Sequence, residues 1–453
     1  MTTQHQLSLW LTARDLPGRL AAQPPQILKP LNEEINRLAT VWIDDLVSYQ
    51  EIEGFGGAFT EAAAVTLGKM PEKKQEEILR AYFDPKTGNA YTLCRSHINS
   101  CDFSTGNYAY CEKEGDTALA SFSIERDRQA LLPMIQRSLK LSGGTMKLFA
   151  SPWSPPAWMK TTNQMNRGGQ LKPEYRAAWA EYYVRYIQEY AKAGVNIWGL
   201  TVQNEPEAIQ TWDSCVYSGA EERDFVRDHL GPALERAGLG HVKIIIWDHN
   251  RDHLYARAKT IYSDSQAARY IWGAGFHWYS ANVFENVQRT HEAWPNKKLL
   301  FTEGCQEGGP HPGSWLTGER YAQSVIQDLN HWTVGWVDWN LVLDETGGPN
   351  HVGNLCSAPI LADTRTGEAH YQSSYYYLGH FSRFIRPGAK RILTTSSRDE
   401  LEVTACKNPD GSLVAVILNR SETPIQMTLK FNQGEVNLES PRRSILTAVL
   451  SKH

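Results

Sequence analysis

IWGLTVQNEP, residues 197–206, has the pattern of a buried strand that ends in polar residues. Ahead of it lies Glu174–Ala193, a stretch with helical spacing that Pro173 precedes and Gly194 follows, as is preferred at helix starts and ends. The strand pattern occurs seven more times along the chain, in IEGFGGA (52–58), YTLCRSHI (91–98), TMKLFAS (145–151), VKIIIWDH (242–249), IWGAGFHW (271–278), KLLFTEG (298–304) and VGWVDWNLV (334–342). Helical stretches, such as Ile124–Leu141, separate these runs, and such alternation is typical of a parallel sheet covered by helices. The pattern therefore predicts an α/β fold, a closed (β/α)8 TIM barrel.

Both ends of the chain have a different pattern. Gln6–Thr12 and Ala39–Tyr49 are strand-like runs separated by a polar, proline-containing stretch. After Pro387–Gly388 come five short strand candidates spaced by turn residues: Lys390–Thr395, Glu400–Lys407, Ser412–Leu418, Gln426–Phe431 and Ser444–Leu450. We therefore expect an all-β sandwich domain made of residues 1–51 and 388–453, attached to a catalytic barrel of residues 52–387.

Composition narrows the function classes. A net charge of −4 gives no reason to expect nucleic acid as a partner, and the 15 Trp and 20 Tyr suit the faces of sugar rings. The N-terminus lacks the pattern of a secretory signal, and no apolar run approaches the length of a membrane span, so we expect no stable membrane insertion. The seven Cys form no C-x-x-C pair, which favours reduced thiols in a cytoplasmic protein. The oligomeric state stays open.

Two carboxylates stand at predicted strand ends, where the reactive groups of a β/α barrel lie. Glu205 follows the fourth strand within Asn204-Glu205-Pro206, and Glu303 ends the seventh. Glycoside hydrolysis needs such a pair, one protonated to release the leaving oxygen and one ionised at the anomeric carbon. We therefore predict Glu205 as general acid/base and Glu303 as nucleophile of a retaining enzyme. This chemistry needs no cofactor or metal, and no H-E-x-x-H motif is present.

Several longer motifs resemble the glucosylceramidase family of glycoside hydrolases (family 30). They are GFGGAFTEAAA (54–64), SCDFST (100–105), SPWSPPAWMK (151–160), VQNEP (202–206), FHWY (276–279), TEGC (302–305), WVDWNLVLDETGGPNHVGN (336–354) and YYYLGHFSRFIRPGAKRI (375–392). The resemblance implies a barrel fused to a β-sandwich from both chain ends, and the same two catalytic glutamates. It also implies a β-linked glucoside or glycolipid as substrate.

Further roles follow from the resemblance. Asp102, Trp153, Trp339 and Asn354 match positions that bind the terminal sugar, and Asn204 matches one that hydrogen-bonds its 2-hydroxyl. Tyr279 is implied to contact the nucleophile and keep it ionised. Arg95 matches a family arginine that pairs with active-site carboxylates, a role compatible with a structural ion pair. His277 lies two residues before Tyr279 on the same predicted strand and therefore on the same side, where it either supports the carboxylates or is a packed histidine of the barrel interior.

The leading interpretation is an exo-acting β-glucosidase. A β-1,6-glucanase, β-xylosidase or β-fucosidase of the same family is the alternative, and a non-catalytic carbohydrate-binding barrel is a remote one. Glu61, His97 and Asn99 depart from the residues expected in the family, which leaves the sugar and leaving-group preference open. The two glutamates are unaffected by these departures.

Overall fold

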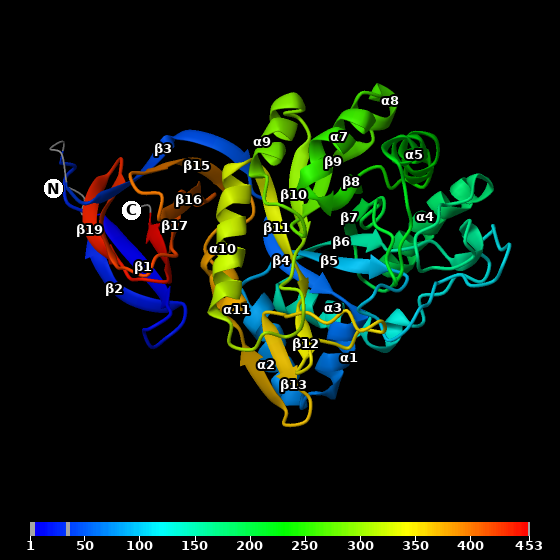
Figure 1. Ribbon diagram of the computed structural model, residues 1–453, viewed down its shortest axis with the longest axis horizontal. Helices are drawn as coiled ribbons and strands as arrows, with labels where there is room; N and C mark the ends of the chain where they lie inside the picture. The colour runs from blue at the N-terminus through cyan, green and yellow to red at the C-terminus, as the bar shows by residue number, and fades with distance from the viewer. Residues whose placement is uncertain (1–4, 33–36, 452–453) are drawn as a thin grey trace.

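The computed structural model describes residues 5–32 and 37–451. Its larger part is the closed barrel predicted from the sequence, in the order β10-β11-β4-β5-β6-β7-β8-β9 (Figure 1). The barrel strands are β4 (Gly54–Phe59), β5 (Leu93–Ile98), β6 (Lys147–Pro152), β7 (Ile197–Thr201), β8 (Lys243–Asn250), β9 (Ile271–His277), β10 (Lys298–Glu303) and β11 (Thr333–Asn340). All neighbouring pairs are parallel, so the carboxyl ends of the eight strands open on one face.

Small and branched residues allow the barrel to close. A Cβ on Gly56 would lie 1.9 Å from the Leu93 carbonyl oxygen, and one on Gly273 would lie 2.2 Å from that of Lys298. These two glycines therefore allow close strand packing. Leu93, Phe149, Ile245, Leu300 and Val337, which come from five barrel strands, form a buried apolar cluster of their own.

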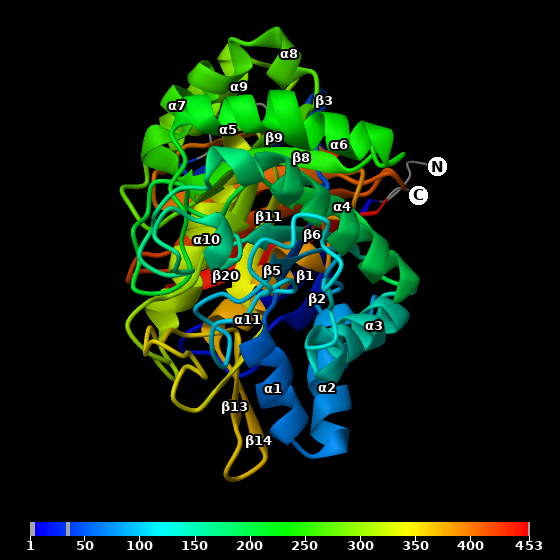
Figure 2. The same ribbon diagram turned by 90° about the vertical axis from the view of Figure 1, so that its right-hand side faces the viewer.

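Helices surround the strands, as the view turned by 90° shows (Figure 2). They are α1 (Glu61–Lys69), α2 (Glu72–Phe83), α3 (Leu131–Leu141), α4 (Arg176–Lys192), α5 (Gly219–Phe225), α6 (Gly231–Arg236), α7 (Leu254–Tyr262), α8 (Ser265–Ala268), α9 (Phe284–Ala293), α10 (Trp315–Asn330) and α11 (Ser373–Ser382). Helix α3 is shorter than the predicted Ile124–Leu141. Asp127 is buried and accepts hydrogen bonds from three tyrosines, which holds the preceding segment as a turn.

A nine-stranded sheet forms the second part of the molecule, in the order β19-β18-β3-β15-β16-β17-β20-β1-β2 (Figure 1). Its strands are β1 (Gln6–Ala13), β2 (Ala21–Ile27), β3 (Ala39–Glu51), β15 (Lys390–Ser396), β16 (Leu401–Lys407), β17 (Leu413–Asn419), β18 (Ile425–Phe431), β19 (Gly434–Ser440) and β20 (Ser444–Leu450). Both chain ends contribute, as predicted. The sheet encloses its own apolar core.

Two strands of this sheet were missed by the sequence prediction. Strand β2 contains Pro24 and Pro25, which are tolerated because β2 lies at the sheet edge, where an N–H without a strand partner costs little. Strand β19 occupies the opposite edge and only two of its seven residues are apolar. A small additional sheet, β12 (Val342–Asp344), β13 (Ile360–Asp363) and β14 (Glu368–Tyr371), was also not predicted.

Helices α10 and α11 connect the two parts. Helix α10 packs on β16 and β17, and α11 packs on β20 and β1. The seven cysteines are all buried free thiols. No helix within residues 5–32 and 37–451 is both long and apolar enough to cross a bilayer.

Candidate active site

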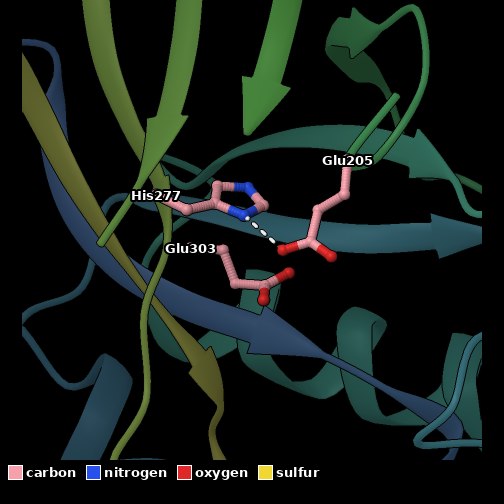
Figure 3. Close-up of side chains that lie close together, drawn as sticks. All are labelled: Glu205, His277 and Glu303. Carbon is pink, nitrogen blue, oxygen red and sulfur yellow. Dashed lines mark hydrogen bonds and ion pairs between the residues drawn. The ribbon is translucent and has the colours of Figure 1, made fainter. Parts of the chain in front are cut away.

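The two predicted catalytic carboxylates face each other at the carboxyl end of the barrel. Glu303 is the last residue of β10, and Glu205 follows β7 in a tight turn with a φ of 47°. A hydrogen bond of 2.9 Å from the Glu205 backbone N–H to the Asp248 carbonyl oxygen anchors that turn. One oxygen of each carboxyl group and a ring nitrogen of His277 lie within 4.8 Å of one another, and Figure 3 shows the three side chains converging. The structure thus brings the pair to a single site.

Arg95 links the residues beneath this pair. It is fully buried on β5, and its guanidinium forms an ion pair with Glu303. The same group donates to Asn204 Oδ1 at 2.9 Å and to Asp248 Oδ2 at 2.8 Å. Its carbon lies 4.7 Å from the ring centroid of Trp153. A planar guanidinium with several fixed donors suits these divergent partners in a way that a lysine ammonium does not.

Tyr279 completes the surroundings of Glu303. Its hydroxyl donates to Glu303 Oε1 at 2.9 Å, the contact that the family resemblance implies. The same hydroxyl lies 3.4 Å from Cys305 Sγ. Two donors, Arg95 and Tyr279, therefore hold the Glu303 carboxyl in one orientation and favour its ionised form.

His277 and Asp248 organise the other carboxyl group. One ring nitrogen of His277 lies 3.3 Å from Glu205 Oε1 and the other lies 3.0 Å from Asp248 Oδ1. Thr201 donates to Asp248 Oδ2 at 2.7 Å. Sequence reasoning missed Asp248, although its position at the end of the run VKIIIWDH was a usable signal.

Burial and neighbouring charges shift the pKa values of His277, Glu205 and Glu303. Burial opposes the charged form of His277, but the charges of Glu303, Asp248 and Glu205 outweigh it and raise the pKa of His277 to about 9. Burial also favours neutral Glu205, yet the hydrogen bond with His277 and the charges of the nearby histidines together outweigh it and lower the pKa of Glu205. Burial, helped by the negative charge of Glu205, raises the pKa of Glu303. Burial and the two neighbouring donors therefore act on the Glu303 carboxyl in opposite directions.

Asp102 and Asn354 contribute polar side chains to the same pocket. Asp102 Oδ2 accepts hydrogen bonds from Asn354 at 3.1 Å and from Asn350 at 3.2 Å. Burial raises the pKa of Asp102 to about 8 despite these bonds, so the ligand-free carboxyl is neutral at pH 7. Sequence reasoning did not identify Asn350. Trp153 and Trp339 stack beside Asp102, with their ring centroids 5.1 Å apart.

The active-site side chains line a cavity of about 320 Å³. Of the predicted residues, it is lined by Asp102, Trp153, Asn204, Glu205, Tyr279, Glu303, Trp339 and Asn354, whereas Arg95 and His277 lie behind its wall. A larger surface hollow of about 980 Å³ between residues 107–114 and 156–167 contains neither carboxylate. We therefore take the smaller cavity as the active site.

The three departures from the family pattern do not line this cavity. Glu61 pairs with Arg126 at 2.8 Å and accepts from the Thr105 backbone at 2.7 Å. His97 accepts from the Glu61 N–H at 3.0 Å, and Asn99 accepts from the Tyr110 N–H at 3.0 Å. These residues support the loops around the pocket and leave its chemistry to other groups.

Within residues 5–32 and 37–451, Glu205, His277 and Glu303 are the one group spaced to hold a metal ion. The raised pKa of His277 and the ion pair of Arg95 with Glu303 place two positive charges where a cation would sit. The arrangement of Glu205, His277 and Glu303 therefore suits proton transfer and nucleophilic attack better than it suits metal binding.

Comparisons with known proteins agree with this geometry. A family model described as the glycosyl hydrolase family 30 TIM-barrel domain matches residues 52–385, and one described as the family 30 beta sandwich domain matches residues 388–448. Lysosomal acid glucosylceramidase of Mus musculus is 37% identical over 419 residues, covering 88% of this chain and 81% of that protein. The crystal structure of SrfJ from Salmonella typhimurium superposes with a TM-score of 0.94 at 38% identity, covering all of both chains. The endo-beta1,6-glucanase BT3312 superposes with a TM-score of 0.90 at 28% identity, covering 99% of this chain and 100% of that one.

Proposed function

The chain belongs to glycosyl hydrolase family 30, within its glucosylceramidase group, and we propose that it is a retaining, exo-acting β-glucosidase of that type. One observation carries the proposal: an oxygen of Glu205 and an oxygen of Glu303 lie within 4.8 Å of each other in one cavity. Retaining enzymes hold their carboxyl groups about 5–5.5 Å apart, whereas inverting enzymes need about 6.5–9.5 Å to admit a water molecule.

In this proposal Glu303 attacks the anomeric carbon while Glu205 protonates the leaving oxygen. The covalent glycosyl-enzyme is then hydrolysed by a water molecule that Glu205 deprotonates. Arg95 and Tyr279 orient Glu303, and Asn204 contacts the sugar 2-hydroxyl from its place beside Arg95.

The reaction requires Glu205 to be protonated and Glu303 to be ionised once the sugar is bound. The leaving oxygen of a bound sugar gives protonated Glu205 a hydrogen-bond acceptor, which favours the neutral form of that acid. Arg95 and Tyr279 then favour the charge on Glu303. His277 lies against Glu205 and is positioned to share a proton with it.

Exo action is proposed from the polar groups that Asp102 and Asn354 present to the cavity. Asp102 accepts hydrogen bonds from Asn350 and Asn354, and Asn350 also donates to the Asn354 carbonyl oxygen. Fixed polar groups of this kind can bind the outer hydroxyls of a terminal sugar. The substrate we propose is a β-linked glucoside or glycolipid.

A β-1,6-glucanase is the second candidate, favoured by the TM-score of 0.90 to an endo-beta1,6-glucanase over 99% of this chain. Both candidates cleave glucosides, so a preference of the enzyme for glucosides over xylosides and fucosides would distinguish them from a β-xylosidase or a β-fucosidase.

A panel of 4-nitrophenyl β-glycosides with ¹H NMR of the first-formed sugar tests the proposal. We expect cleavage of the β-glucoside with β-glucose as the first product. Release of α-glucose would exclude the double-displacement route, and no cleavage of the glucoside would exclude the glucosidase assignment. The cytoplasmic location stays a prediction.

A further inference from the structure

The active-site cavity contains residues beyond those assigned to the catalytic pair and the terminal sugar. Gln210 and Trp212 come from the loop after Glu205, His249 and Asn250 from the end of β8, and Glu307 from the loop after β10. In the proposed mechanism the leaving group departs on the side of the acid, Glu205. Polar and aromatic side chains from loops beside the acid therefore surround the place of the leaving group.

A β-bulge directs His249 into this cavity. Trp247 and Asp248 have φ values of 73° and 53°, and the register of β8 against β9 shifts between Trp247 and His249. Bulges beside active sites commonly redirect a side chain in this way. As a result Asp248 lies beneath the carboxylates, bonded to Arg95 and His277, while the next residue lines the cavity.

The imidazole of His249 is partly buried and lacks the hydrogen bonds that three fully buried histidines make. Its Nδ1 is shielded from solvent, and within residues 5–32 and 37–451 it has no hydrogen-bond partner. By contrast, both ring nitrogens are bonded in His97, His277 and His380. Burial lowers the pKa of His249, so the ring is neutral and offers one donor and one acceptor. Because Nδ1 is shielded, a ligand in the cavity reaches the ring at Nε2, which also has no hydrogen bond within the described residues. A group that displaces water from Nε2 must supply a hydrogen bond in its place.

Trp212 is the second unassigned group with an available surface. It is half-buried against the apolar cluster that contains Trp153 and Trp339. No other aromatic ring of the described residues stacks on its indole. An indole face of this kind suits the apolar face of a sugar ring.

We propose that His249 and Trp212 form a leaving-group subsite for a second sugar ring, with Trp212 stacking on the ring and His249 bonding one of its hydroxyls. The inference rests on the proposed function and narrows it: the preferred substrates are β-linked glucosyl disaccharides or oligosaccharides. A purely apolar leaving group would leave the His249 nitrogen unpaired and would be disfavoured.

Three substrates separate the subsite from the chemistry. β-Glucosyl fluoride has a single-atom leaving group and reports the glucosidase reaction alone. Gentiobiose carries a second glucose, and octyl β-glucoside carries an alkyl chain. The variants are His249→Ala, His249→Asn, Trp212→Ala and Trp212→Phe, with His241→Ala as control, because His241 is exposed ahead of the opposite end of β8.

We expect the wild type to prefer gentiobiose over octyl β-glucoside in kcat/KM. His249→Ala and Trp212→Ala should each lower kcat/KM for gentiobiose about tenfold. The same variants should change fluoride release by less than about threefold, and His249→Asn and Trp212→Phe should recover part of the loss. His241→Ala should change neither reaction.

Equal losses for gentiobiose and the fluoride would overturn the subsite, as would no loss for either. So would a wild-type preference for octyl β-glucoside, which would indicate a lipid leaving group. If the wild type releases no fluoride, the proposed function fails and the subsite falls with it. Fluoride release without gentiobiose cleavage would overturn the subsite alone.

Discussion

Arg95 is the residue whose removal should disturb the active site most. Its guanidinium has no exposed surface and pairs with two buried carboxylates, Glu303 and Asp248. Arg95→Met keeps most of the side-chain volume but leaves both acids without this counter-charge. Breaking a buried ion pair on one side typically costs about 3–5 kcal/mol. We expect a loss of this size in the free energy of unfolding.

The catalytic loss should be separable from the loss of stability. Arg95 orients both Glu303 and Asn204, and a hydrogen bond to a charged group contributes about 1.5–3 kcal/mol. We therefore expect Arg95→Met to lower kcat/KM for β-glucosyl fluoride at least about a hundredfold under conditions where the variant is folded. Arg95→Lys keeps the charge but not the fork of donors, so it should recover stability more fully than activity.

Urea unfolding followed by tryptophan fluorescence, together with fluoride release, measures both effects. Arg236→Met is the matched control, since Arg236 and its ion-pair partner Glu181 are both exposed and lie outside the cavity. It should cost less than about 1 kcal/mol. If Arg95→Met unfolds like the control, or keeps wild-type kcat/KM, the account of Arg95 as the organiser of this site is wrong.

Three further predictions concern the carboxylates and their neighbours. Glu205→Ala should regain turnover of an activated aryl glucoside with azide and give the β-azide, whereas Glu303→Gly should give the α-azide; the opposite products, seen by ¹H NMR, would reverse the two roles. Because the pKa of Asp102 is about 8, Asp102→Asn at pH 6 should lose less than about tenfold in kcat/KM while Asp102→Ala loses about a hundredfold, and equal losses would contradict a neutral Asp102. Because the pKa of His277 is about 9 in the folded protein and about 6.5 when unfolded, its protonation stabilises the folded state. This contribution, about 3 kcal/mol at most, is fully present below about pH 6.5 and is lost as the pH rises through about 9. The difference in unfolding free energy between wild type and His277→Gln should therefore shrink over that range, and a constant difference would refute the assignment.

The barrel and its catalytic pair were predictable because each depends on local pattern. Apolar runs mark buried parallel strands, and a barrel places its reactive groups at their carboxyl ends, which singled out Glu205 and Glu303. The short helix α3 was predicted too long because the contacts of Asp127 with three tyrosines are tertiary. Edge strand β2 was missed because prolines normally argue against a strand.

The network around the pair was less predictable. Arg95 and Glu303 lie 208 residues apart, and only the closed barrel brings them together. Asn350 acts through Asp102 from a loop without regular spacing, and the orientation of His249 depends on a bulge in β8. Sequence pattern indicates which residues reach the barrel mouth, but their mutual contacts arise from folding.

The central claim, a covalent intermediate on Glu303, can be tested with a 2-deoxy-2-fluoro-β-glucoside that carries a good leaving group. The fluorine slows hydrolysis of the glycosyl-enzyme, so peptide mass mapping of the inactivated protein identifies the labelled residue. We predict one sugar per chain, attached to the peptide containing Glu303. A label on Glu205 or elsewhere, or full turnover of ordinary glucosides with an inverted product and no label, would contradict the account.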